Sequence, residues 1–434
     1  MAEISPLELL QNLLRFDTTN PPGNEAECIT YVNNLLTEAG FETTLVARAP
    51  ERPNLITRLK GQGNVAPLLL FGHVDVQPTG GQTWKHPPFE GKVADGYIWG
   101  RGALDMKSGV AMMLSAMLRA KREGLIPAGD VVLAVLSDEE GLGFNGAQYV
   151  VEEYASLFEG IHYAIGEFGG FTFYLGRRKF YPIQVQEKQA CLVKAKIRGQ
   201  GGHLSLPLRR SVMTQLGSVL VKLERQRTPV HVTPVARQTI EGFASGLPFP
   251  ANLILRQLLN PMLADMVLRA LGAKGQAVEP LIRNIMSAWS VTGTSVPSET
   301  DLILVGILLP GYGPSDMLAE LRPILRDSVE TEVFLFNPGP PNPDMGLFDT
   351  LAGILREADP DGIPVPLLMP APTDACFFGR LGIETYGFTP MKLPDGFNFW
   401  EFIHAADERI PVEAVQFGAD MIYKLLQRFG QVVH

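Results

Sequence analysis

The chain has 434 residues, of which 46% are hydrophobic and 19% are charged, and its formal net charge is −9. This length and apolar content are enough to bury the cores of two or three domains. The negative charge and the lack of a Lys/Arg-rich block argue against a nucleic-acid partner. Because no apolar run reaches the ~20 residues of a membrane span, no membrane partner is expected either.

The three cysteines, Cys28, Cys191 and Cys376, are far apart and form neither a disulfide framework nor a CxxC metal site. The first 16 residues lack the basic and long apolar regions of a signal peptide, and they predict an amphipathic helix that begins near Ser5. We therefore expect a cytoplasmic protein.

Helical and extended patterns alternate in the first 188 residues. Apolar residues recur at helical spacing in three segments, at 5–15, 24–39 and 108–122. Short apolar runs that predict strands occur at 43–47, 54–59, 67–71 and 130–136. Strands that alternate with helices predict an α/β domain whose mostly parallel sheet is flanked by helices.

The pattern changes between residues 189 and 337. The expected elements there are a strand at 190–198, a helix at 211–225, an extended stretch at 229–241 and a proline-punctuated helical block at 247–290. They predict an α+β lid domain, residues 189–337, inserted into the α/β domain. Residues 1–188 and 338–434 would then form the two parts of the catalytic domain.

Polar motifs follow two of the predicted strands. His73 and Asp75 follow the third apolar run, and Glu139 and Glu140 follow the fourth. Asp105 lies between these motifs, after Gly-Arg-Gly. Ligands of parallel sheets gather at the carboxyl ends of strands. One imidazole with several carboxylates suits a pair of cations such as zinc, and two such ions can polarise a carbonyl and generate hydroxide at neutral pH. The sequence therefore predicts a metal-dependent hydrolase.

Two further residues extend this ligand set to two histidines and three carboxylates. Glu167 follows another short apolar run, and His404 lies near the C-terminus. Since Glu139 and Glu140 are adjacent, in an extended segment they would point in opposite directions, one toward metal and one toward substrate. Each signal alone is weak, because a Glu-Glu pair is usually a solvated surface and a lone histidine is more often structural. Their order and context are specific.

These motifs resemble a known family of di-zinc metallopeptidases, peptidase family M20. The matching stretches are Gly-His-Val-Asp-Val-Gln-Pro at 72–78, Gly-Arg-Gly-Ala-Leu-Asp-Met-Lys at 100–107 and Asp-Glu-Glu-Gly at 138–141, with further matches at 199–207, 373–375 and 404–411. The family includes acetylornithine deacetylases, succinyl-diaminopimelate desuccinylases, glutamate carboxypeptidases and aminoacylases. The extra helical block resembles the long-lid branch that contains N-fatty-acyl-amino-acid hydrolases.

The resemblance implies a role for each proposed metal ligand. Asp105 would bridge two divalent ions, most simply Zn²⁺, with Co²⁺ or Mn²⁺ as alternatives. His73 and Glu167 would complete one site, and Glu140 and His404 the other. A cis peptide is also expected after the bridging aspartate.

The resemblance further implies how the site works. Glu139 would be the general base that takes a proton from a metal-bridged water and passes it to the leaving nitrogen, so that a metal-bridged hydroxide attacks an amide. Asp75 would orient an imidazole ligand. His203, in Gly-Gly-His-Leu-Ser-Leu-Pro, would stabilise the oxyanion, often in the partner subunit of a homodimer formed through the lid. A loop histidine that caps a helix, and a monomer whose lid covers its own site, are the alternatives.

The chain departs from the family where substrate is recognised. Ile307 stands where many members have the arginine that grips a substrate carboxylate, and Thr294 replaces an asparagine. Such an arginine forms bidentate, charge-assisted bonds that neither replacement can make. Arg177 and Arg178 could substitute for it, and Thr373 is a further candidate substrate contact.

An aromatic cluster precedes the last histidine ligand. Phe397, Phe399, Trp400 and Phe402 lie within six residues, and they either line an apolar pocket or pack the loop. We favour hydrolysis of a small N-acyl amino acid or short peptide with an apolar acyl or aromatic group. The alternatives are a dipeptidase or carboxypeptidase that releases a C-terminal amino acid, and a non-catalytic metal-dependent binding protein. Glu139 argues against the last, since metal binding alone does not need it.

Overall fold

The computed structural model describes residues 4–200, 210–225, 227–292, 298–325 and 329–431. The chain forms two compact units. The first comprises residues 1–185, 344–367 and 373–434, and the second comprises residues 186–343 and 368–372. Among the described residues, no helix combines the length and the apolar character that crossing a membrane requires.

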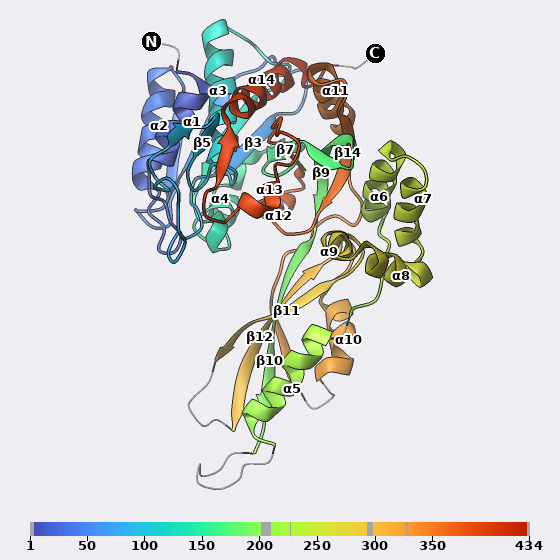
Figure 1. The fold of residues 1–434 in the computed structure, drawn as a ribbon. Coiled ribbons are helices and arrows are strands. Elements are labelled where there is room, and N and C mark those ends of the chain that lie inside the picture. Colours follow the sequence, from blue (N-terminus) through green and yellow to red (C-terminus); the bar gives the residue numbers. More distant parts are fainter. Residues whose placement is uncertain (1–3, 201–209, 226, 293–297, 326–328, 432–434) are drawn as a thin grey trace. The chain divides into compact units, whose positions relative to one another are not determined.

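The first unit is built on a nine-stranded sheet with the order β1-β2-β6-β3-β7-β15-β9-β14, and β8 pairs with β9. Figure 1 labels β3, β7, β9 and β14 of this sheet. Its strands are β1 (Thr43–Ala47), β2 (Pro53–Leu59), β3 (Leu68–His73), β6 (Val131–Leu136), β7 (Tyr163–Gly166), β8 (Phe173–Leu175), β9 (Arg178–Glu187), β14 (Ile363–Met369) and β15 (Glu384–Gly387). The four central strands β6, β3, β7 and β15 are parallel, whereas β1, β2 and β9 pair antiparallel.

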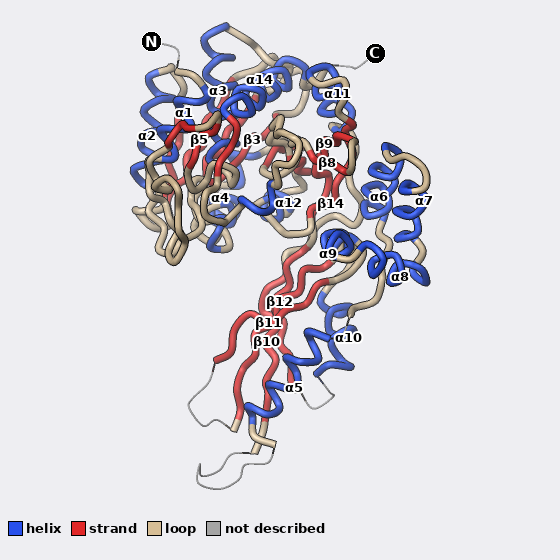
Figure 2. The backbone as a smooth tube through the Cα atoms, in the orientation of Figure 1, coloured by secondary structure: helices blue, strands red, loops and turns tan. Residues whose placement is uncertain are grey.

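Helices cover this sheet, and a small second sheet adjoins it (Figure 2). The helices are α1 (Pro6–Leu14), α2 (Ala26–Glu38), α3 (Lys107–Glu123), α4 (Ala147–Glu153), α11 (Phe348–Ala358), α12 (Ala375–Gly379), α13 (Phe399–Phe402) and α14 (Val412–Arg428). The small sheet contains β4 (Lys92–Ala94), β5 (Tyr97–Trp99) and β16 (Arg409–Pro411). Helix α3 packs on β3 and is flanked by α1 and α14. The predicted α/β class is therefore confirmed.

The core explains why β3 and β6 form where the apolar runs predict them. All six residues of each strand are buried, which is typical of parallel strands covered on both faces. One core cluster joins Leu69 and Phe71 of β3 to Phe377 and Phe378 of α12. Helix α1 begins as expected, since Ser5 Oγ accepts a hydrogen bond from the Glu8 backbone N–H at 3.2 Å.

The second unit is an α+β module. Its antiparallel sheet has the order β11-β12-β10-β13. Its elements are β10 (Gln189–Arg198), α5 (Val212–Arg225), α6 (Pro234–Gly246), α7 (Ala251–Arg256), α8 (Pro261–Leu271), α9 (Ala273–Val278), β11 (Ile285–Thr292), β12 (Glu299–Leu308), α10 (Pro314–Leu325) and β13 (Glu330–Phe336). Helices α5 and α10 pack on one face of the sheet around Leu304 and Leu321.

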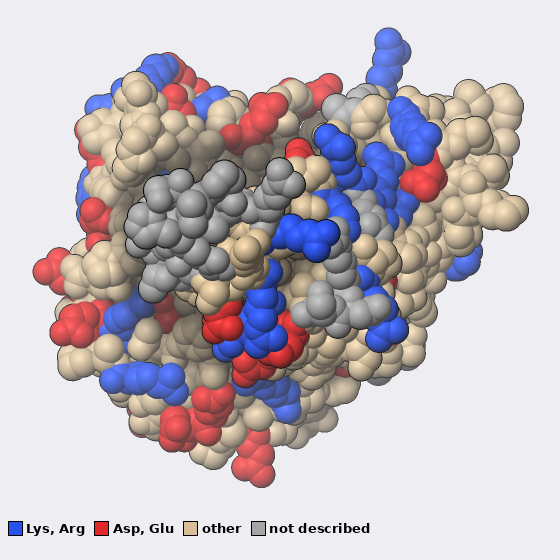
Figure 3. All heavy atoms as spheres, turned by 90° about the horizontal axis from the view of Figure 1, so that it is seen from below, with Lys and Arg blue, Asp and Glu red and all other residues tan. Residues whose placement is uncertain are grey.

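Basic and acidic side chains lie beside one another on the surface shown in Figure 3. In the second unit, Arg198 of β10 pairs with Glu330 of β13 and Glu299 of β12. Lys194 likewise pairs with Glu332. Opposite charges on neighbouring strands thus stabilise this sheet across its exposed side.

The expectation of an extended stretch at 229–241 is wrong, because α6 begins at Pro234. Thr233 caps this helix, with its Oγ1 3.3 Å from the Ala236 backbone N–H, and proline occupies the first helical position. Val235, Thr239 and Ile240 are buried at helical spacing. The Thr-Pro start signal therefore outweighs the β-branched composition.

Candidate active site

The candidate metal ligands stand at the carboxyl ends of adjacent parallel strands. His73 is the last residue of β3, Glu167 follows β7, and Glu140 lies in a short 3-10 helix, Glu139–Gly141, that follows β6. Because β6, β3 and β7 are neighbours in the sheet, these side chains are brought together at one edge. Asp105 immediately precedes Met106 and α3, and the peptide bond between Asp105 and Met106 is cis.

Five side chains form two overlapping groups that share Asp105. His73, Asp105 and Glu167 make the first group, and Asp105, Glu140 and His404 make the second, with ligand atoms within 4.8 Å of one another in each. His73 Nε2 lies 3.2 Å from Asp105 Oδ1, and His404 Nε2 lies 2.9 Å from Asp105 Oδ2. Each carboxylate oxygen of Asp105 thus faces a different histidine, as a bridging ligand requires.

The donor set fits divalent cations. Imidazole nitrogens and carboxylate oxygens are ligands that zinc accepts. Asp75 holds the Nδ1 side of the His73 ring, since Nδ1 lies 3.0 Å from the Asp75 carbonyl oxygen. The Nε2 atom therefore faces Asp105 and Glu167, the other ligands of its group. Glu140 Oε1 is buried and lies 3.2 Å from His404 Nε2, the histidine of the same group.

The negative charges of these carboxylates would be stabilised by bound cations. Burial, reinforced by the charge of Asp105, raises the pKa of Glu167 to about 7, although a hydrogen bond with His73 opposes this. Burial alone would lower the pKa of His73, but hydrogen bonds to three carboxylates raise it well above its usual value. These carboxylates are costly to keep charged together, and cations between them would relieve that cost.

Glu139 stands beside the first group without belonging to either. Its Oε2 lies 3.9 Å from His73 Nε2. Burial, followed by the charge of Glu167, raises the pKa of Glu139 well above its usual value. The expected extended segment is wrong, because Glu139 and Glu140 lie in a 3-10 turn. Neighbours in such a turn still diverge by roughly 120°, so the two carboxylates separate as the pattern predicts.

Asp75 does more than orient an imidazole. Its Oδ1 accepts the backbone N–H of Glu139 and its Oδ2 that of Glu140, both at 3.1 Å. Asn20 donates to Asp75 Oδ2 at 2.8 Å and to Asp138 Oδ1 at 3.0 Å. Asp75 therefore fixes the turn that carries two of the key carboxylates.

A buried charge network that the sequence does not predict lies behind this turn. Arg52 donates to Asp138 Oδ1 at 2.6 Å and makes two further bonds to the carboxylate of Glu25. Asp138 adopts a left-handed backbone with φ +70°, which its side chain stabilises by accepting the Asn145 N–H. Only the Asp-Glu-Glu motif points to Asp138, and no local pattern points to Arg52.

The remaining predicted site residues form no hydrogen bond or ion pair with the candidate metal ligands that the structure describes, or lie outside the described residues. Arg177 and Arg178 are exposed in the β8–β9 hairpin, and their side chains form no hydrogen bond or ion pair within the described ranges. Thr373 Oγ1 accepts the Ala375 N–H at 3.1 Å, a local bond at the start of α12. His203 and Thr294 lie outside the described residues.

The aromatic cluster divides into packed and exposed members. Phe399 is buried and stacks on Phe171 with ring centroids 4.3 Å apart. Trp400 is 48% exposed and lies 4.9 Å from the ring of Phe168, the residue that follows Glu167. This pair joins the loops that carry Glu167 and His404.

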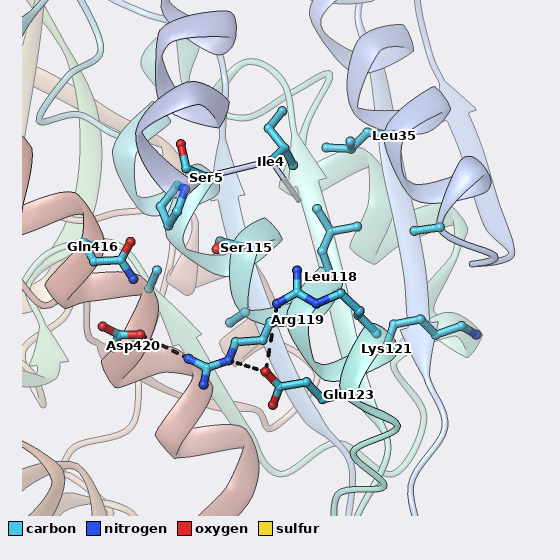
Figure 4. A pocket seen from close by; sticks show the side chains of 15 residues that line it. Ile4, Ser5, Leu35, Ser115, Leu118, Arg119, Lys121, Glu123, Gln416 and Asp420 are labelled. Carbon is cyan, nitrogen blue, oxygen red and sulfur yellow. Dashed lines mark hydrogen bonds and ion pairs between the residues drawn. The ribbon is translucent and has the colours of Figure 1, made fainter. Parts of the chain in front are cut away.

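A cavity of about 710 Å³ lies elsewhere in the first unit, between α1, α2, α3 and α14 (Figure 4). None of the predicted site residues lines it. Its Arg119 pairs with Glu123 and with Asp420. No histidine lines this cavity, and both of its carboxylates, Glu123 and Asp420, pair with Arg119, so it offers no comparable chemistry.

Comparisons with known proteins agree with this geometry. The chain is 27% identical over 397 residues to the human N-fatty-acyl-amino acid synthase/hydrolase PM20D1, covering 87% of this chain and 77% of that protein. It is 27% identical over 450 residues to the succinyl-diaminopimelate desuccinylase of Paracoccus denitrificans, covering 98% of each chain.

Solved structures share the fold. The M20 family metallo-carboxypeptidase Sso-CP2 from Sulfolobus solfataricus matches with a TM-score of 0.68 and 17% identity, covering 98% of each chain. Human carnosine dipeptidase 1 matches with the same TM-score and 14% identity, covering 98% of this chain and 97% of that one. A match to the family itself spans residues 69–428. The chain therefore belongs to peptidase family M20/M25/M40, and it is a metallo-hydrolase that acts on amide bonds.

Proposed function

We propose that this protein hydrolyses the amide bond of N-acyl amino acids or short peptides that carry an apolar acyl or aromatic group, with two zinc ions as cofactors. The observation that carries the proposal is the position of Asp105, one oxygen toward each histidine, with Glu139 beside the cluster. His73, Asp105 and Glu167 would hold one ion. Glu140 and His404 would hold the other together with Asp105.

The bound ions would polarise the scissile carbonyl and lower the pKa of water. Glu139 accepts a proton from the attacking water and delivers it to the leaving amine nitrogen. Its placement supports this role, because its side chain is only 17% exposed, stands beside His73 and lies in neither ligand group. Asp75 keeps Glu139 in reach by holding its backbone N–H.

Apolar side chains beside the loops that carry the metal ligands support the proposal that the substrate has an apolar group. Trp400 and Phe168 lie next to the His404 and Glu167 loops. Trp400 is exposed, whereas Phe168 is buried beneath it, and Leu142 and Phe144, just beyond Glu140, are exposed too. Large exposed apolar groups near a polar centre are typical of sites that bind apolar ligands. Ile307 in place of the family's arginine favours the same class.

The test is hydrolysis of N-acyl amino acids of increasing acyl length and of dipeptides, with bound zinc counted, by wild type and Glu139→Gln. We expect both proteins to bind two zinc ions. Wild-type activity should rise with acyl length. The kcat of Glu139→Gln should be lower by a factor of about 100 or more. Wild type that binds zinc but cleaves none of these compounds would overturn the proposed substrate class.

A dipeptidase or carboxypeptidase would use the same ligands but need the substrate carboxylate. Comparing an N-acyl amino acid with its amide-capped analogue separates the two. Equal hydrolysis of both supports the proposal, whereas strict dependence on the free carboxylate supports the carboxypeptidase.

A further inference from the structure

A fully buried arginine lies under the second ligand group. Arg101 is 0% exposed, and its Nη1 donates to Glu408 Oε2 at 2.6 Å. The same guanidinium donates to the carbonyl oxygens of His404 and Ala405 at 3.0 and 3.2 Å. Its Nε donates to the carbonyl oxygen of Gln77 at 3.0 Å. A planar fork with five donors can hold more groups at once, and in a more fixed geometry, than the three donors of a lysine.

Glu408 extends this contact to the bridging ligand. Its Oε1 accepts the backbone N–H of Leu104 at 2.7 Å and that of Asp105 at 3.2 Å. Its own carbonyl accepts the Gly100 N–H at 3.0 Å. Glu408 is itself 0% exposed, so its charge depends on Arg101 for compensation.

Each ligand of the second group is therefore tied to Arg101 directly or through one residue. Arg101 holds His404 by donating to its backbone carbonyl. Arg101 holds Asp105 indirectly, because Glu408 accepts the Asp105 backbone N–H. Glu140 is reached through Gln77, whose side chain donates to Glu140 Oε2 at 2.6 Å. His73 and Glu167 belong only to the first group. Within the described part of the chain, neither forms a hydrogen bond or an ion pair with Arg101 or Glu408.

The two histidines also differ in support from their surroundings. The His73 side chain is 1% exposed at the end of a buried strand. The His404 side chain is 44% exposed in a loop, where its backbone has φ +59°. A non-glycine residue keeps such a left-handed conformation only when its surroundings hold it. The hydrogen bonds from Arg101 to the carbonyl oxygens of His404 and Ala405 stabilise this backbone conformation.

We propose that the Arg101–Glu408 pair is the positioning device for the second cation site, because it holds all three of that site's ligands, Asp105, Glu140 and His404. The first site retains its ion without the pair, because the pair holds only the shared Asp105 among its ligands. This inference rests on the two-cation centre of the proposed function. Neither residue touches substrate, and the pair acts through the ligands that it places. Its removal loosens one cation rather than both.

The test is zinc content after dialysis against a weak chelator, together with a zinc titration of kcat and KM. The variant is Arg101→Met. The matched control is Arg283→Met, a similarly buried arginine of the second unit that pairs with Asp265 and Glu279. We expect two ions in wild type and control and one in Arg101→Met. Half-maximal activity of Arg101→Met should need about 10- to 100-fold more zinc, with KM unchanged once zinc saturates.

Rescue of kcat by zinc separates positioning from general damage, since a misfolded chain would not recover. If Arg101→Met does not fold, Glu408→Gln takes its place, because it keeps the size and one acceptor but removes the charge. Two ions held at wild-type affinity, or loss of both ions together, would overturn the inference. Wild type that binds no zinc would instead overturn the proposed function.

Discussion

At the residue scale, the buried carboxylate of Asp75 shows how one side chain can serve two parts of a site. Its Oδ1 lies 3.3 Å from His73 Nδ1, and its two oxygens accept the backbone N–H groups of Glu139 and Glu140. The spacing of two residues after His73 predicts the first contact. The second could not be predicted, because it joins segments more than 60 residues apart.

Replacing Asp75 by asparagine should loosen the Glu139–Glu140 turn. The amide keeps one acceptor but turns its NH₂ group toward a backbone N–H that then loses its partner. We expect kcat to fall about 10- to 100-fold while the protein remains folded. Steady-state kinetics and zinc content check this, with the exposed Asp361→Asn as control. An unchanged kcat would contradict the structural argument.

Lys188 is a buried titratable group in the second unit. Its Nζ donates to the Arg283 carbonyl at 2.8 Å, and burial lowers its pKa from 10.5 to about 7 even though Glu320 opposes this. Between these two pH values the unfolded chain binds a proton that the folded chain does not. Stability against unfolding should therefore rise with pH from about 7 to 10.5.

Urea unfolding at several pH values tests this, with wild type compared to Lys188→Met. The methionine variant should lose that rise, although the unpaired Arg283 carbonyl lowers its stability at every pH. A slope that is the same in both proteins would show that Lys188 does not titrate in this range.

At the element scale, the short helix α13 combines packing and exposure. Phe399 anchors it by stacking on Phe171, and this leaves Trp400 at the surface beside the loops that carry His404 and Glu167. The sequence is compatible with both a pocket lining and loop packing for this cluster, because four aromatic residues in six positions fit either. Only the burial of each ring distinguishes the two.

Trp400→Ala should reduce kcat/KM for a long-chain N-acyl substrate about 10-fold and leave an N-acetyl substrate nearly unchanged. The reason is that only the long chain would lose apolar contact area with the indole. Phe334→Ala, which removes a similarly exposed aromatic residue of β13, is the matched control. Equal losses for both substrates would assign Trp400 to loop packing.

At the scale of the whole molecule, the resemblance to the family predicts a homodimer in which His203 acts on the partner's site. Sedimentation equilibrium should then give twice the chain mass. Mixing the inactive variants Glu139→Gln and His203→Ala should restore part of the activity, because one site of a mixed dimer has both residues. A fully active monomer would contradict this prediction.

The sequence alone predicted the α/β class, the family, and which side chains are candidate ligands, because strand runs, helix starts and metal motifs are local patterns. It was wrong about α6 and about the extended Glu139–Glu140 segment, where capping and turn geometry decide. Tertiary structure decided which side chains meet. Asp105 and His404 are 299 residues apart, and Arg101 and Glu408 are 307 apart. Such contacts depend on how strands and loops pack, and no local spacing specifies that packing.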